Sequence, residues 1–422
     1  MYWSQVRVLD GPPKNIMNTK ISFLITNFNT KKYTQWSYNS IRNNLGKDHE
    51  IVLLDDGSID GTWDLLKELK SKDRNLIIHK NDDNVGIAYS FNKMVDLSTN
   101  ETICMLHSDM YVPPKFDEIV LNYINQYDFI TPLRVEPEVG YPKSPDKLII
   151  DFGKKSENFK ESEFLQWSRG NTEKNKGKVE SRMFFPWVTK KSLYKKIGGN
   201  DLLFLKFMVE DDDFYLRIKM SGAKYCQLFE TAVYHMPSKS VRMREDQKIN
   251  FDNQYHKSIR NFIRKWGVHP ENIWDKGNGD ILVPNKYDIG FRVRNCNEKI
   301  LHLLEPWCSD ICINNKNLIS KYILEEQKNT LYNLSNRVHH EENDLKNKII
   351  VNFDGIILNN AERVMFLQSL SSYLFNNKQL GKKKHDIFDL NISSLESLKN
   401  INLQPIHCSE DIIKNNVKHL LG

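Results

Sequence analysis

The residues best suited to chemistry stand where an apolar run stops. Residues 102–106 read Thr-Ile-Cys-Met-Leu, and His107, Ser108 and Asp109 follow them directly. Such a run is typical of a buried parallel strand, and the carboxyl end of a strand is where open α/β sheets bind ligands. A carboxylate in that position can hold a divalent cation against a diphosphate, because hard cations share oxygen ligands with phosphates. The competing interpretation is that Asp109 only caps the next helix.

Two further groups of acids stand at the ends of predicted elements. Asp55 and Asp56 end the apolar run 50–54, although a plain Asp-Gly turn is the simpler interpretation of this pair. Acids also fill positions 210–213, at the start of a helix predicted over 207–222 that carries bases later. That charge order suits the helix dipole, but four acids in a row exceed what capping needs.

Alternating strands and helices must position these side chains. Strands are predicted over 20–27, 50–54, 75–79 and 102–106, and each of the first three is followed by a helical pattern. This order indicates an α/β fold with a mostly parallel, Rossmann-like sheet, right-handed crossovers and flanking helices. The polar turns that follow the strands therefore share one edge of the sheet.

The second half of the chain is less regular. The polar segment 154–178 is poor in aliphatic residues, so we expect a mobile loop there. Two short strands are predicted over 224–230 and 231–235, and a helix with one apolar face over 248–266. The glycine-rich turn at 277–280 favours a linker.

These boundaries predict a lead-in over 1–18, a first domain over 19–275 and a smaller α/β or α+β domain over 281–422. We find no repeat and no chemical motif in the last region. A role in packing or homo-oligomerisation is favoured there over a second catalytic domain, although acceptor binding is a further option.

Composition suits a globular protein with an anionic ligand. The 422 residues include 60 Lys and Arg against 54 Asp and Glu, a net charge of +6. This modest excess suits a sugar nucleotide and does not require a nucleic acid. Six scattered cysteines without a zinc-like spacing indicate reduced thiols in a cytoplasmic protein. No long apolar run and no signal-peptide pattern occur, so no transmembrane segment is expected.

Residues 19 to about 240 resemble the inverting GT-A glycosyltransferases of family 2. The resemblance is specific because several short motifs occur in the family's order. They are, in chain order, Thr26-Asn27-Phe28-Asn29, Asp55–Thr62, Asn84-Val85-Gly86 with Asn92, His107-Ser108-Asp109, Gly198–Asp201, Glu210–Asp213 and His235.

The resemblance implies the GT-A fold and a nucleotide-sugar donor, with a UDP-sugar expected ahead of a GDP-sugar. It places Asp55 or Asp56, with Thr26 beside it, against the donor's base. A carboxylate there accepts a charge-assisted hydrogen bond from an imide N–H. Further positions matched to donor-binding residues of the family are Asn29, Asn84, Gly86, Asn92 and His107.

The resemblance also implies a metal and a base. Asp109 would bind Mn²⁺ or Mg²⁺ between the two phosphates of the donor. His235 would be either a further ligand, which suits manganese, or a structural residue. Asp211 would be the general base that takes the proton of the acceptor hydroxyl as it attacks C1 opposite the diphosphate. The alternative for Asp211 is an acid that only favours a helix start.

The chain departs from the family pattern at two positions. His107 replaces the usual first Asp of the Asp-x-Asp turn, and Phe91 stands where many members have Arg or Lys next to Asn92. Farther along, Arg242 and Arg244 would either clamp the diphosphate or lie in a solvated basic loop.

Three functions are compatible with these patterns. The first is a metal-dependent inverting glycosyltransferase acting on a glycan, a lipid-linked sugar or a protein. The second is a catalytically silent module that binds a sugar nucleotide or a glycan, which the altered residue His107 favours. The third is a sugar-phosphate nucleotidyltransferase, which is weaker because the turn 26–30 contains no glycine to approach a triphosphate.

Overall fold

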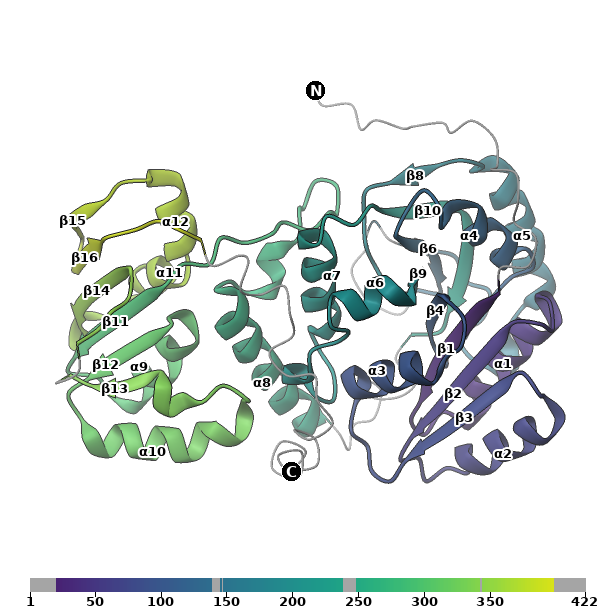
Figure 1. Ribbon diagram of the computed structural model, residues 1–422, viewed down its shortest axis with the longest axis horizontal. Coiled ribbons are helices and arrows are strands. Elements are labelled where there is room, and N and C mark those ends of the chain that lie inside the picture. The colour runs from purple at the N-terminus through teal and green to yellow at the C-terminus, as the bar shows by residue number, and fades with distance from the viewer. Residues whose placement is uncertain (1–19, 139–144, 146, 238–247, 342–343, 398–422) are drawn as a thin grey trace. The chain divides into compact units, whose positions relative to one another are not determined.

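The structure is a computed structural model, drawn as a ribbon in Figure 1. The residues that it describes are 20–138, 145, 147–237, 248–341 and 344–397. No helix within these ranges is long and apolar enough to cross a membrane. Contacts divide the chain into two compact units, each with its own sheet. The first unit contains the chain up to Asn200, Phe214–Asp252 and Asp275–Ile281, and the second contains Asp201–Asp213, Asn253–Trp274 and the chain from Leu282.

Four parallel strands form one side of the first sheet, in the order β3-β2-β1-β4. Their bounds are β1 (Ile21–Asn27), β2 (Glu50–Asp56), β3 (Leu76–Asn81) and β4 (Thr102–His107). The connecting helices are α1 (Lys31–Asn44), α2 (Thr62–Lys72) and α3 (Ile87–Leu97). Figure 1 shows α3 on the opposite side of these strands from α1 and α2. The predicted α/β class is therefore confirmed.

The sheet continues from β4 through β9, β6, β10 and β5. Strand β9 is antiparallel to β4 and β6, β10 is parallel to β6, and β5 is antiparallel to β10. The bounds are β5 (Met110–Tyr111), β6 (Phe129–Glu136), β7 (Lys147–Ile149), β8 (Val179–Glu180), β9 (Trp187–Lys190) and β10 (Tyr225–His235). The remaining helices here are α4 (Phe116–Tyr123), α5 (Glu161–Lys174), α6 (Lys191–Lys196) and α7 (Glu210–Met220).

The pairing of the strands brings the polar turns close to one another. Thr26 lies opposite His107, and Asp56 lies opposite Asn81. At the far side of the sheet, His235 lies opposite Met110. The end of β10 is thereby brought beside the turn that follows β4, although more than a hundred residues separate them in the chain.

The prediction of a mobile loop over 154–178 is wrong, because α5 occupies most of this segment. Phe164 of this helix is fully buried, and its ring lies 6.0 Å from that of Trp167 and 5.5 Å from that of Tyr234 on β10. Aromatic side chains supply the apolar face of α5, so its few aliphatic residues do not prevent a helix from packing on the sheet.

Two other boundaries differ from the prediction. The segments 224–230 and 231–235 form one strand, β10, with an irregular register between Leu228 and Ala232. The helix predicted from 207 begins at Glu210. It cannot begin earlier because Met208 and Val209 have φ of 80° and 59°, outside the right-handed helical region.

The second unit contains a smaller sheet in the order β13-β12-β11-β14-β16-β15, which confirms a second α/β region. Its first four strands are parallel and its last two form an antiparallel hairpin. The strands are β11 (Ile289–Arg294), β12 (Asp310–Ile313), β13 (Val338–His340), β14 (Ile349–Asp354), β15 (Gly381–His385) and β16 (Phe388–Ile392). The helices are α8 (Lys248–Trp266, assigned here from Asn253), α9 (Glu298–Leu304), α10 (Lys316–Glu326), α11 (Ala361–Gln368) and α12 (Leu370–Asn377).

A buried ion network lies within this second unit. Glu305 is fully buried, and its carboxylate accepts hydrogen bonds from Arg264 (2.7 Å), Arg337 (2.8 Å) and the Tyr322 hydroxyl (3.0 Å). Burial works against ionisation of Glu305, but the two guanidinium groups hold its pKa far below the ordinary range. The network links α8 to the chain around β12 and β13.

Candidate active site

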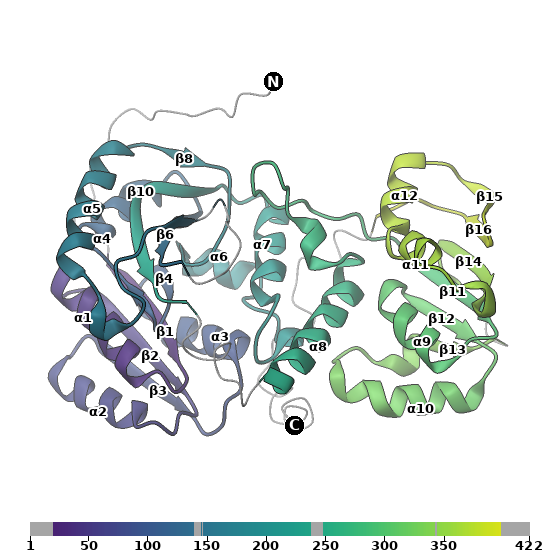
Figure 2. The same ribbon diagram turned by 180° about the vertical axis from the view of Figure 1, so that it is seen from behind.

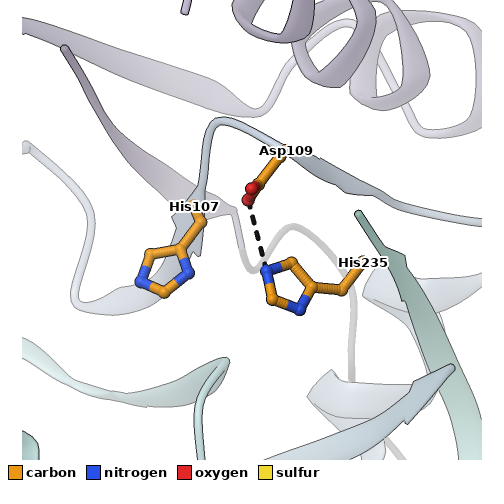
Figure 3. A group of neighbouring side chains, drawn as sticks. All are labelled: His107, Asp109 and His235. Carbon is orange, nitrogen blue, oxygen red and sulfur yellow. Dashed lines mark ion pairs between the residues drawn. The ribbon is translucent and has the colours of Figure 1, made fainter. Parts of the chain in front are cut away.

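Three side chains from two distant parts of the chain meet at the edge of the first sheet. His107 ends β4, Asp109 lies in the turn between β4 and β5, and His235 ends β10. One atom from each lies within 4.8 Å of the others. Figure 3 shows the two imidazoles and the carboxylate gathered around a common point. This geometry brings together the two predicted metal ligands, Asp109 and His235, and one of the predicted donor-binding residues, His107.

The electrostatics of this trio suit a bound cation. Asp109 is buried, its Oδ1 atom lies 3.3 Å from His235 Nε2, and this oxygen accepts no hydrogen bond from the described residues. Burial works against ionisation of Asp109, but the neighbouring His235 imidazole lowers its pKa. Burial lowers the pKa of His107 to about 3, so this imidazole is neutral and has a free electron pair for a metal.

Glu136, at the end of β6, completes the site and was missed by the reasoning from sequence. Its Oε1 atom lies 2.7 Å from His235 Nδ1. Arg134 and Lys147 each form a 3.0 Å ion pair with the same carboxylate. Burial works against ionisation, but His235 and the two cations lower the pKa of Glu136 to about 2. The sequence did contain one signal for Glu136: it is an acid at the end of an apolar strand, just as Asp109 comes directly after the apolar strand β4.

An aromatic stack lies against His107. The rings of His107 and Phe185 are 3.9 Å apart and nearly parallel, at 18°. Phe91 also stacks on Phe185, at 6.0 Å and 14°. The two positions that depart from the family pattern, 91 and 107, are therefore joined through one phenyl ring.

In the acidic turn after β2, the two aspartates that the sequence leaves as alternatives for binding the donor's base have different hydrogen bonds. Asp56 is saturated by the protein: Oδ1 accepts from Asn81 Nδ2 (2.7 Å) and Val85 N (3.0 Å), and Oδ2 accepts from Gly86 N (2.8 Å). Asp55 accepts one hydrogen bond at Oδ1, from the Ser58 N–H at 3.0 Å. Its Oδ2 is buried and accepts no hydrogen bond from the described residues.

Hydrogen bonds join the turn after β1 to this acidic turn. Asn29 adopts a φ of 52°, and its N–H donates to Ser58 Oγ at 2.8 Å. The Ile59 N–H in turn donates to Asn29 Oδ1 at 2.9 Å. Thr26 lies beside His107 in the register of β1 and β4. Asn29 and Thr26 thus lie at the sheet edge that carries Asp55, where a donor role was predicted.

The turn before α3 closes over the acidic turn. Gly57 has a φ of 76°, and a side chain there would come within 2.6 Å of the Asp83 carbonyl carbon. This close approach places Asn84 and Gly86 next to the acidic turn. Asn92 has a different set of contacts, because its Oδ1 accepts from Asn200 N at 2.8 Å and its Nδ2 donates to Asn200 O at 2.8 Å. A contact of Asn92 with the donor stays a prediction.

The four acids at the start of α7 have different surroundings, all within the second unit. Asp213 is buried and pairs with Lys265 at 2.6 Å and Trp266 Nε1 at 2.9 Å, so it is structural. Asp212 accepts from Trp274 Nε1 at 3.1 Å, and burial together with its acidic neighbours raises its pKa. Asp211 is exposed, and its predicted role as a base stays a prediction. Arg242 and Arg244 lie outside the described residues.

Comparison with known proteins identifies the class. Residues 22–198, somewhat less than half of the chain, match the model of Glycosyl transferase family 2. This confirms the predicted family for the first unit. The chain from 199 onward lies outside the match.

Individual relatives resemble about a quarter of the chain. The putative glycosyltransferase EpsH of Bacillus subtilis is 29% identical over 102 residues, which are 24% of this chain and 29% of EpsH. An uncharacterized glycosyltransferase of Nostoc, alr2836, is 32% identical over 102 residues, 24% of this chain and 32% of that protein. The chain thus spans about a third of the length of these curated relatives.

Two solved structures are similar to this chain, but only loosely. The crystal structure of GalNAc-T7 with UDP, GalNAc and Mn²⁺ gives a TM-score of 0.44 at 14% identity, over 60% of this chain and 48% of that one. S. aureus TarS 1-349 in complex with UDP gives 0.40 at 16% identity, over 58% and 72% of the two chains.

Proposed function

We propose that this protein is a metal-dependent inverting glycosyltransferase that moves a sugar from a nucleoside diphosphate to an acceptor hydroxyl. One observation carries the proposal: His107, Asp109 and His235 converge at the carboxyl edge of a family 2 domain, and a buried Asp109 oxygen there lacks a hydrogen bond. A resident cation would take up that oxygen and neutralise charge on the departing diphosphate.

The donor set favours manganese over magnesium. Two imidazoles and one carboxylate offer two nitrogens and one oxygen, and imidazole suits Mn²⁺ better than Mg²⁺, which prefers oxygen. His107, Asp109 and His235 would hold the ion. One donor atom of each residue already lies within 4.8 Å of the others.

We assign recognition of the donor's base to Asp55. Its unpartnered Oδ2 can accept from the N–H of uracil or guanine, both of which pair such a group with a carbonyl. Thr26 and Asn29 lie at the same edge. A UDP-sugar is the first donor to test and a GDP-sugar the second.

Asp211 is our candidate base. It is exposed at the start of α7, and its Oδ1 accepts a hydrogen bond from the Asp212 N–H at 2.9 Å. Asp212 and Asp213 are engaged with tryptophan N–H groups. As a carboxylate it would accept the proton of an acceptor hydroxyl that attacks C1 opposite the diphosphate, which inverts the configuration.

The test is Mn²⁺-dependent hydrolysis or transfer with a panel of nucleotide sugars. Asp211→Asn should lose at least about a hundredfold in kcat, the usual size of a lost acid–base contribution. Asp109→Asn should lose Mn²⁺ binding and the Mn²⁺-dependent activity with it. The exposed surface variant Asp64→Asn should keep full activity. Full activity in Asp211→Asn removes the base, and tight donor binding without turnover in the wild type favours a silent binding module instead.

A further inference from the structure

We propose that Glu136 is a positioning residue that fixes the His235 imidazole for metal binding, an inference that rests on the metal-dependent function above. His235 has a carboxylate at each ring nitrogen. Glu136 Oε1 lies 2.7 Å from Nδ1, and Asp109 Oδ1 lies 3.3 Å from Nε2. The first contact is a hydrogen bond, whereas Asp109 Oδ1 makes none. Nδ1 therefore donates its proton to Glu136, and Nε2, which faces Asp109, is the ring nitrogen available to a metal ion once any proton on it is displaced. Burial works against a charged ring, but the two carboxylates raise the pKa of His235.

This arrangement is what a metal-binding histidine requires. Such residues donate their second N–H to a carboxylate or carbonyl, which fixes the tautomer and the ring orientation and makes the ligand more basic. The hydrogen bond between Glu136 and Nδ1 is by itself sufficient to favour this tautomer of His235. A Glu136 with a purely structural role would contribute to stability but would leave the metal affinity unchanged, so the two roles can be separated by experiment.

The sheet itself holds Glu136 in place. Strands β6 and β10 are parallel neighbours, with Val135 opposite Tyr234, so Glu136 and His235 are the next positions along the same pair. Figure 2 shows the two strands side by side. Arg134 and Lys147 balance the charge of the carboxylate through 3.0 Å ion pairs. A buried acid at this position thus stays ionised and stationary before any metal arrives.

The experiment measures Mn²⁺ affinity of the full chain by calorimetry and by the electron paramagnetic resonance signal of free Mn²⁺. Glu136→Gln should weaken Mn²⁺ binding by about 10- to 100-fold, the usual loss when a residue that supports a metal ligand is changed. The matched control is Glu138→Gln, which removes the same charge two residues along the chain at an exposed position. It should bind Mn²⁺ like the wild type.

Equal Mn²⁺ affinity in Glu136→Gln and wild type overturns the inference and leaves the proposed function intact. A wild type that binds no divalent cation overturns both. If Glu136→Gln does not fold, the tautomer of the neutral His235 ring decides instead, read from the imidazole ¹⁵N shifts of the metal-free wild type at a pH high enough for the ring to carry one proton. A proton on Nδ1 supports the inference, and a proton on Nε2 overturns it.

Discussion

Changing Asp55 or Asp56 to asparagine should affect two different properties: Asp56→Asn should lower the stability of the fold, and Asp55→Asn should weaken binding of the nucleotide. Asp56→Asn keeps one oxygen that can accept hydrogen bonds and replaces the other by an NH₂ group. If the remaining oxygen still accepts from Asn81 and Val85, the NH₂ group faces the Gly86 N–H, so two donors meet. Losing one charge-assisted bond and leaving a buried N–H unpaired should together cost about 3–5 kcal/mol of folding free energy. Asp56→Asn should therefore unfold at a distinctly lower temperature.

Asp55→Asn should instead impair ligand binding. Its Oδ1 can still accept from the Ser58 N–H at 3.0 Å, so the turn survives. The position of the unpartnered Oδ2 would become an NH₂ group that repels the N–H of a base. The loss of one charge-assisted hydrogen bond, about 1.5–3 kcal/mol, corresponds to roughly 10- to 150-fold in the Kd for UDP.

The assays are calorimetric titration of UDP in the presence of Mn²⁺ and a thermal melt followed by tryptophan fluorescence. Asp64→Asn, which removes a charge from the exposed face of α2, serves as the control for both. The reasoning fails if Asp56→Asn melts like the wild type and loses UDP binding while Asp55→Asn binds UDP normally.

Three further changes test other parts of the structure. Glu305→Gln leaves two buried guanidinium groups short of a counter-charge, so it should cost about 3–5 kcal/mol in urea denaturation, whereas the exposed Glu325→Gln should cost little. Burial and nearby positive charges lower the pKa of Lys286 to about 7. Between that pH and about 10 the unfolded chain binds the extra proton, so stability should rise with pH, by up to about 1.4 kcal/mol per unit, and Lys286→Met should flatten this rise. Phe185→Leu removes the ring that stacks on His107 and should weaken Mn²⁺ binding about two- to tenfold, as expected for about 0.5–1.5 kcal/mol of aromatic contact; unchanged binding would show that the stack does not orient this ligand.

The sequence predicted the first four strands to within a few residues. Each is a run of apolar residues closed by a polar turn, and a strand buried on both faces needs no other signal. Because the carboxyl ends of parallel strands lie at the same edge of a sheet, the sequence alone placed the turns carrying Asp55 and Asp109 at one edge. The trio also included His235, but only through the family resemblance, since a lone histidine at a strand end is usually structural.

What the sequence could not show depends on pairing between distant strands. Glu136 and His235 are 99 residues apart, and their contact follows from β10 lying next to β6 rather than from any local pattern. The same holds for the saturation of Asp56, because its partners come from the turn before α3. Residues 154–178 were misjudged for a different reason: the apolar face of α5 is aromatic, and the expectation of a loop weighed only its aliphatic content.

The two departures from the family pattern have one physical explanation. An acid at 107 would set a second carboxylate beside Asp109 and against the face of Phe185, where desolvation without a partner is costly. A base at 91 would set a cation near that ring, in a position where Phe91 is now buried. Replacing both removes one positive and one negative charge, so the local balance is kept. A neutral imidazole stacked on Phe185 would then supply a metal ligand in place of an acid, so His107 is consistent with the proposed metal site and need not mean that activity was lost.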